Sequence, residues 1–125
     1  MDFYQIPDWK EYEELVCDAL RQENPELTIE RNIHIVGNLS SQRRQIDIAL
    51  KGKMAGHEIL AIVDCKCYSR KIDVNDVGTF VTLLNDVGAD IGILVTRLGY
   101  SQAAKTIMTF LEERNYEKRN FTRGC

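Results

Sequence analysis

The stretch "HEILAIVDCKCYSRKIDVNDVGTFVTLLNDVGADIGILVT", residues 57–96, contains two apolar runs separated by an amphipathic segment. The first run ends in polar residues and has the form of a central strand that is buried on both faces. In the middle segment apolar residues recur at steps of three and four between a candidate N-cap, Asp73, and a stop signal, Gly88, which predicts a helix. The run "IGILVT" predicts another buried strand. This strand–helix–strand order favours a parallel pair with a right-handed crossover.

The flanking segments extend this unit into a larger sheet. Residues 27–37 and 40–52 alternate apolar with polar side chains, which predicts two strands in an antiparallel meander. A first helix is expected from Asp8, and a last helix from Ser101. The last helix should turn four side chains inward: Ala104, Ile107, Met108 and Leu111. The order helix, three strands, helix, strand, helix therefore predicts an α/β fold with a central mixed sheet.

Length and composition favour one soluble domain over residues 1–125, in which the polar segment 116–125 is expected to be a frayed tail. The 44% hydrophobic content is ordinary for a globular protein. No apolar stretch approaches the roughly 20 residues that span a membrane, and the first residues lack the pattern of a signal peptide. We therefore expect a cytoplasmic protein with no membrane association.

The net charge of -3 argues against a protein that holds nucleic acid by bulk electrostatic attraction. Positive charge is concentrated, however, in residues 40–71, which carry seven basic and three acidic side chains. A local basic face is thus compatible with the acidic average.

Polar residues interrupt the first apolar run at "DCKC". Because side chains alternate along a strand, Asp64 and Lys66 share one face, while Cys65 and Cys67 share the other. A closed zinc site needs about four ligands, and no Cys-x-x-Cys or His-x(3-5)-His spacing supplies them. The cysteines are better explained as small core hydrophobes.

A charged pair at a strand end has two explanations, a plain salt bridge or a reactive site. Asp47 favours the second, because the meander places its strand beside the strand of Asp64. Two carboxylates form a hard oxygen site suited to Mg²⁺, and a lysine beside them can offset charge on a phosphate or deprotonate a water. Asp47, Asp64 and Lys66 together indicate phosphodiester hydrolysis.

Four motifs in order resemble the Mrr-type restriction endonuclease catalytic domain of the PD-(D/E)XK nuclease superfamily. They are "YEELV" in the first helix, "QID" at 45–47, "DCK" at 64–66, and "GILVT" followed by "GYSQAA". The resemblance covers residues 9–108 and implies a restriction-endonuclease-like three-layer α/β/α fold. It also implies a DNA endonuclease that depends on Mg²⁺, with Mn²⁺ as a substitute.

Carried onto this sequence, the resemblance implies that Asp47 and Asp64 bind the metal, with the backbone carbonyl of Cys65 as a third ligand. Lys66 would be the catalytic lysine.

The first-helix motif implies that Glu13 orients the metal site or a water. Glu14 is the competing choice, since adjacent helix positions differ by about 100° in direction.

Residues near the expected site are candidates for contacts to DNA backbone phosphates. These are Arg43, Arg44, Gln45, Ser69, Arg70 and Lys71. For each, a solvated surface position is the alternative.

The chain has no room for the separate DNA-recognition module that usually accompanies such a domain. We expect specificity to come from a further domain or partner, from a homodimer, or from DNA shape. The alternative functions are a Holliday-junction-resolvase-like nuclease and a catalytically inert DNA-binding or interaction module of the same fold.

Overall fold

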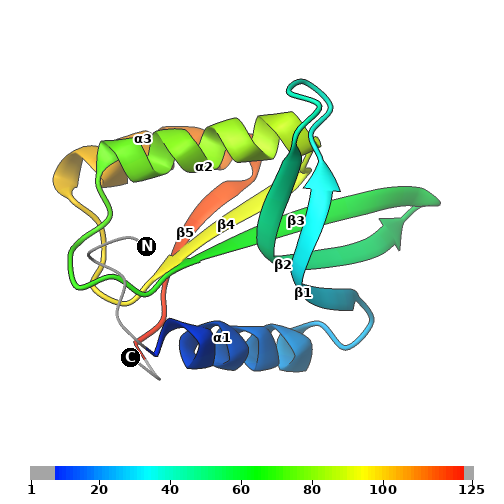
Figure 1. Cartoon of the computed structure of the whole chain (residues 1–125), viewed down its shortest axis with the longest axis horizontal. Helices are drawn as coiled ribbons and strands as arrows, with labels where there is room; N and C mark the ends of the chain where they lie inside the picture. Colours follow the sequence, from blue (N-terminus) through cyan, green and yellow to red (C-terminus); the bar gives the residue numbers. More distant parts are fainter. Residues whose placement is uncertain (1–7, 123–125) are drawn as a thin grey trace.

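The computed structural model describes residues 8–122, and its elements form one five-stranded sheet with helices on both faces (Figure 1). In chain order they are α1 (Trp9–Glu23), β1 (Thr28–Val36), β2 (Arg43–Met54), β3 (His57–Lys66), α2 (Val74–Val87), β4 (Ile91–Thr96), α3 (Gln102–Leu111), a 3-10 turn (Glu112–Arg114) and β5 (Tyr116–Asn120). α1 covers one face of the sheet, and α2 and α3 cover the other (Figure 1). This is the expected three-layer α/β/α arrangement.

The sheet is mixed, with strand order β1-β2-β3-β4-β5. β1, β2 and β3 form an antiparallel meander, whereas β3, β4 and β5 run parallel. The carboxyl ends of the three parallel strands lie together at one end of the sheet, which is the usual position of ligand sites in α/β proteins.

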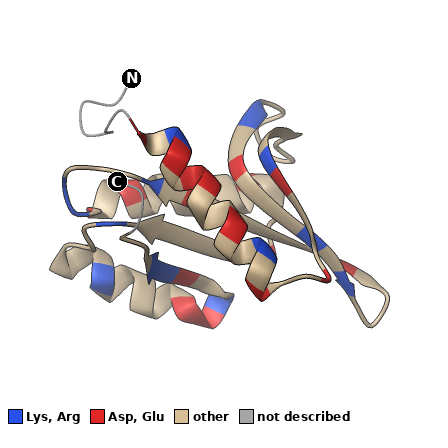
Figure 2. Ribbon diagram, turned by 90° about the horizontal axis from the view of Figure 1, so that it is seen from below, with Lys and Arg blue, Asp and Glu red and all other residues tan. Residues whose placement is uncertain are grey.

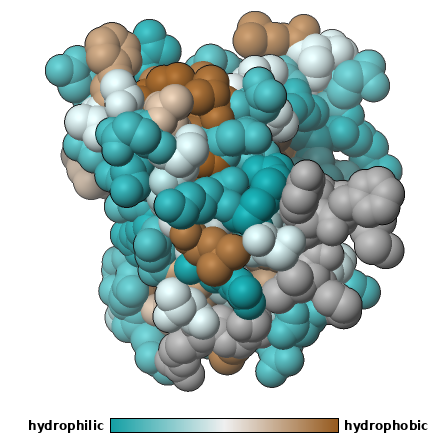
Figure 3. Space-filling view, turned by 90° about the vertical axis from the view of Figure 1, so that its left-hand side faces the viewer, coloured by the Kyte–Doolittle hydropathy of each residue, from teal (hydrophilic) through white to brown (hydrophobic). Residues whose placement is uncertain are grey.

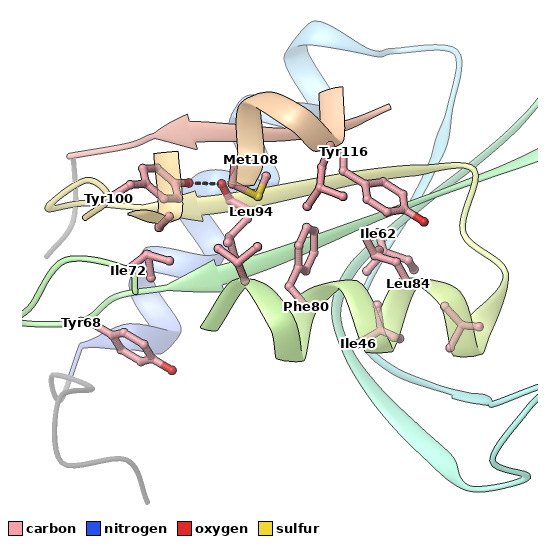
Figure 4. Close-up of a cluster of buried hydrophobic side chains, with 14 of the residues drawn as sticks. Ile46, Ile62, Tyr68, Ile72, Phe80, Leu84, Leu94, Tyr100, Met108 and Tyr116 are labelled. Atoms are coloured by element: carbon pink, nitrogen blue, oxygen red, sulfur yellow. Dashed lines mark hydrogen bonds between the residues drawn. The ribbon is translucent and has the colours of Figure 1, made fainter. Parts of the chain in front are cut away.

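The expected central strand, β3, is buried on both faces. Ile62 belongs to the cluster that packs under α2 and α3, while Val63 belongs to the cluster under α1. Figure 4 shows the first cluster, in which Phe80 and Leu84 of α2 face strand residues such as Ile62. Strand alternation alone accounts for this two-sided core.

β1 and β2 bend sharply away from β3 (Figure 1). Ile46 packs in the α2/α3 cluster and Ile48 in the α1 cluster, although a straight strand would point both to one face. The β2–β3 pairing begins only at Ile48, and Asn32, opposite Asp47 on β1, has φ 50. The bend therefore centres on Asp47 and opens the sheet beside the end of β3.

The helix ends follow the sequence signals. Asp73 caps α2 in a capping box with Asp76, and Gly88 ends it in the left-handed conformation. Ser101 caps α3, whose inward face carries Ala104, Met108 and Leu111. The expectation that Ile107 faces inward is wrong: it is 37% exposed, because three inward positions already complete the narrow stripe of this ten-residue helix.

The expected frayed tail is a second correction, because residues 116–120 form β5, an edge strand parallel to β4. Tyr116 is buried in the α2/α3 cluster, and the Phe121 amide donates to the Thr96 carbonyl. The strand escaped detection because a charged edge strand buries little apolar surface. Residues 123–125 of the expected tail lie outside the described residues.

No helix within residues 8–122 is long and apolar enough to cross a membrane.

Candidate active site

A pocket of about 280 Å³ opens at the end of β3, where β2 bends away. α1, β2 and β3 all contribute to its walls. Its lining residues are Trp9, Glu13, Gln45, Asp47, Asp64, Cys65, Lys66 and Tyr68. The structure thus brings together, in one pocket, every residue that the sequence analysis placed at the metal and catalytic positions.

Asp64 and Lys66 form an ion pair inside this pocket. The distance from the Lys66 Nζ to the Asp64 Oδ2 is 3.3 Å, and the two side chains are only 20% and 16% exposed. Burial disfavours the ammonium, but the nearby Asp64 carboxylate outweighs it and raises the pKa of Lys66. Lys66 is therefore held in its charged form.

Asp47 lies across from this pair and accepts a hydrogen bond of 2.9 Å from the Cys65 amide. Burial first, and the nearby Asp64 carboxylate second, raise the pKa of Asp47 to about 9. Two carboxylates that share a partly buried site cannot both ionise easily, so a cation placed between them would be bound favourably.

Glu13 is only 2% exposed and turns from α1 toward the same pocket. Its Oε1 is a buried oxygen with no hydrogen-bond partner, an arrangement that costs free energy unless a ligand satisfies it. Burial is the main cause that raises the pKa of Glu13 to about 7, and Asp64 acts in the same direction. Glu14, the competing position, is exposed.

The donor set has the composition of an open Mg²⁺ site. Within residues 8–122, no group of three or more His, Cys, Asp or Glu side chains is arranged to hold a metal ion. Mg²⁺, however, is commonly held by one or two carboxylates and keeps several waters. Asp47 and Asp64 fit this requirement, and the unpartnered Glu13 oxygen is a further acceptor within the pocket.

The three cysteines within residues 8–122 do not form a cluster of metal-binding thiols. Cys17, Cys65 and Cys67 are all buried in the hydrophobic cluster under α1. Cys65 also lines the pocket, and its backbone amide donates a hydrogen bond to the Asp47 Oδ2. The antiparallel pairing of β3 with β2 stops at Val63, so Cys65 lies just beyond it, where β2 bends away.

Two arginines predicted near the DNA are engaged in ion pairs within the protein. Arg44 contacts Asp86 at 2.6 Å, and Arg70 contacts Asp76 with two guanidinium nitrogens at 2.6 and 3.1 Å. Neither arginine lines the pocket. Arg44 thus links β2 to the end of α2, and Arg70 links the β3–α2 connection to the start of α2.

The remaining predicted contacts divide by position. Gln45 lines the pocket and donates to Asn32 at 3.3 Å. Arg43 and Ser69 are exposed outside it, and Lys71 lines a second pocket nearby.

Two aromatic side chains form walls of the pocket: sequence reasoning missed Trp9, whereas Tyr68 begins the segment 68–71 that it placed at the rim of the site. Trp9 precedes Glu13 by four positions on α1, and Tyr68 follows Lys66 by two positions. The Lys66 Nζ lies 5.6 Å from the Tyr68 ring centroid, a cation–π distance. Helical and strand periodicity already placed each aromatic beside a site residue, so these spacings were the available signal.

Comparison with known proteins shows the family and the fold of the chain. The sequence model of a restriction endonuclease catalytic family, Mrr-type, matches residues 6–115. The chain belongs to this family. Its motifs lie on α1, β2, β3 and β4, and those of α1, β2 and β3 contribute residues to the pocket. No curated protein matches the chain.

Two crystal structures share the fold. AF1548, a protein of unknown function, has a TM-score of 0.69 at 14% identity, over 90% of this chain and 58% of AF1548. Protein VC1899 from Vibrio cholerae has a TM-score of 0.56 at 19% identity, over 86% of this chain and 29% of VC1899. The Mrr-family chain thus spans only part of the length of both structures.

Proposed function

We propose that this protein is a metal-dependent DNA endonuclease that hydrolyses phosphodiester bonds. The observation that carries the proposal is the convergence of Asp47, Asp64 and Lys66 in one pocket, beside the unpartnered carboxylate of Glu13. Membership in a restriction endonuclease family makes DNA the expected substrate.

Asp47, Asp64 and the Cys65 carbonyl would hold Mg²⁺, with Mn²⁺ as a substitute. The bound ion would supply Lewis-acid polarisation of the phosphate and lower the pKa of a bound water. Asp47 must lose its proton to serve as a ligand, because its pKa lies near 9 without a metal.

Lys66 contributes positive charge. Its raised pKa keeps the ammonium protonated at neutral pH, with no lone pair to take a proton, so charge stabilisation is favoured over deprotonation of the water. The ammonium would stabilise negative charge that develops on the phosphate oxygens.

Glu13 would accept a hydrogen bond from a water in the pocket through its buried Oε1. A pKa near 7 allows it to exchange a proton in the neutral range. This role acts on the position of the water and does not require direct contact with the phosphate.

DNA specificity is a separate part of the proposal. Residues on the pocket rim, Gln45 foremost, would contact backbone phosphates, whereas recognition of sequence would require a further domain, a partner or a second copy of the chain.

The proposal is tested by cleavage of plasmid, four-way junction and single-stranded DNA in Mg²⁺ and in EDTA. The parent protein should cut in Mg²⁺ and not in EDTA, whereas Lys66→Ala should not cut in either. Lys53→Ala removes an exposed lysine at the opposite end of the sheet and is the matched control, which should cut normally.

The substrate panel also separates the alternatives. Preference for the junction would favour a resolvase-like nuclease. Absence of cleavage on every substrate by a folded parent protein would favour an inert module and overturn the proposal.

A further inference from the structure

A second pocket, of about 410 Å³, lies at the carboxyl ends of β4 and β5. The candidate active site lies at the carboxyl end of β3, at the same end of the sheet. Four cationic side chains line it: Lys71, Lys105, Lys118 and Arg119. Among residues 8–122, no Asp or Glu contributes to its lining. On a chain with net charge -3, this is a marked local concentration of positive charge, which attracts anions.

Part of the negative charge lies away from this pocket. Figure 2 shows acidic residues along the exposed side of α1, on the face of the sheet opposite α3. Figure 3 looks onto the end of the molecule where β3, β4 and β5 terminate, and hydrophilic surface runs across its middle. Apolar patches interrupt this surface, so the positive charge of the second pocket comes from its own lining residues.

The pocket is assembled from segments that the backbone fastens together. The Ile72 amide donates to the Gly99 carbonyl at 2.9 Å, and the Ser101 amide donates to the Ile72 carbonyl at 2.8 Å. The buried Tyr100 hydroxyl lies within hydrogen-bonding distance of one carbonyl on β4 and one on β5. These contacts fix the backbone segments around the pocket relative to one another.

The cations differ in their availability to a ligand. Within the described part of the chain, neither Lys71 nor Lys105 forms an ion pair, and both are exposed. Lys118 approaches one carboxylate only at 3.9 Å, whereas Arg119 pairs with two carboxylates. Lys71 and Lys105 are therefore the side chains best placed to bind an incoming anion.

The two pockets are close enough to share one nucleic-acid strand. Tyr68 lines the candidate active site and Lys71 lines the second pocket, so their Cα atoms lie within about 11 Å, three residues apart. One strand of duplex DNA carries a phosphate every 3.4 Å or about that along the helix axis. A strand held at the first pocket would have further phosphates within reach of the second.

We propose that this cationic pocket binds a backbone phosphate of the DNA strand whose neighbouring phosphodiester occupies the candidate active site. The inference rests on the proposed function and adds a binding site outside the catalytic residues. Lys71 and Lys105 are its principal contacts. Because lysine binds phosphate as a point charge, the site positions DNA without selecting its sequence.

The test is equilibrium binding of a duplex oligonucleotide, followed by fluorescence anisotropy in EDTA over a series of salt concentrations. The double variant Lys71→Gln/Lys105→Gln should bind more weakly, and the slope of log affinity against log salt should become shallower by about one for each lysine. Lys53→Gln, which removes the same charge at the opposite end of the sheet, should keep the parental slope. Cleavage by the parent in Mg²⁺ is measured in parallel.

Each outcome decides a different claim. If the parent binds and cuts DNA but the double variant keeps its slope and affinity, the phosphate site is wrong while the nuclease function stands. The same holds if Lys53→Gln loses as much as the double variant does, because the attraction is then spread over the surface. If the parent neither binds nor cuts DNA, both proposals are overturned.

Discussion

Burial and the neighbouring Asp64 carboxylate both raise the pKa of Asp47. Its pKa in the folded protein is about 9, against an ordinary value near 4 in the unfolded chain. Between these two pH values the folded state binds a proton that the unfolded state has released. The free energy of unfolding of the metal-free protein should therefore fall as pH rises through this window.

Asp47→Asn should remove this dependence while keeping an oxygen for the Cys65 amide. We expect the variant to gain at least about 1 kcal/mol in stability relative to the parent between pH 6 and pH 9, measured by urea unfolding in EDTA. Asp18→Asn, at an exposed carboxylate on α1, is the control and should follow the parent. Parallel pH profiles for Asp47→Asn and the parent would show that Asp47 is ionised throughout.

Binding of Mg²⁺ should release protons, because the ion requires Asp47 to be deprotonated. Glu13, whose pKa lies near 7, is a second source of protons in the same pocket. We expect the affinity for Mg²⁺ to rise from pH 6 to pH 9. Calorimetric titrations in two buffers of different ionisation enthalpy measure the protons released, and Asp47→Asn should release fewer. Affinity that is independent of pH would contradict the assignment of Asp47 as a ligand.

At the scale of elements, the bend of β2 depends on how the β1–β2 turn is anchored to the end of α2. Asp86 of α2 accepts hydrogen bonds from the Leu39 and Ser40 amides at 2.9 Å each and pairs with Arg44. A Cβ placed on Gly37 would lie 2.1 Å from the Asp86 Oδ2. Gly37 is therefore required by the close approach of the Asp86 carboxylate.

Two glycine-to-alanine variants should thus change stability in opposite directions. Gly37→Ala displaces the Asp86 anchor and should lower the free energy of unfolding by about 1 kcal/mol or more. Gly78→Ala adds a methyl in open space on the exposed side of α2 and should raise it by up to about 1 kcal/mol. Urea unfolding of both variants measures the difference; a shift in the same direction for both would contradict the packing described at Gly37.

Local signals explain which elements could be predicted from the sequence. Asp73, Gly88 and Ser101 mark helix ends through short-range hydrogen bonds and backbone conformation, and the structure confirms all three. β5 buries little beyond Tyr116, and it exists because the edge of β4 lies beside it. That edge is a property of the assembled sheet, which no local pattern contains.

In the candidate site, too, local patterns predicted some features, while long-range contacts became visible only in the fold. Strand alternation predicted that Asp64 and Lys66 share a face, and the meander predicted that Asp47 lies nearby; the structure brings the three together. The engagement of Arg44 by Asp86 joins residues 42 positions apart. Such long-range pairs distinguish a structural arginine from a surface one only after the fold is known.

At the scale of the whole molecule, the carboxyl ends of three parallel strands lie at one end of the sheet, and both proposed DNA contacts lie there. The acidic surface of α1 is kept on the other side of the sheet from α3 (Figures 1 and 2). This segregation reconciles the proposed DNA-cleaving role with a negative net charge. It also predicts that DNA affinity falls steeply with salt, since phosphate contacts would supply most of it.

The central claim is that Asp64 and Lys66 act as one metal-dependent catalytic unit. The most direct measurement is the single-turnover rate of plasmid cleavage in Mg²⁺ for the parent, Asp64→Asn, Lys66→Gln and the double variant. Residues that act as a unit give strongly non-additive losses. We predict that each single variant loses nearly all cleavage and that the double variant is no slower than the worse single one. Parental rates in either single variant, or losses that multiply in the double variant, would contradict the account.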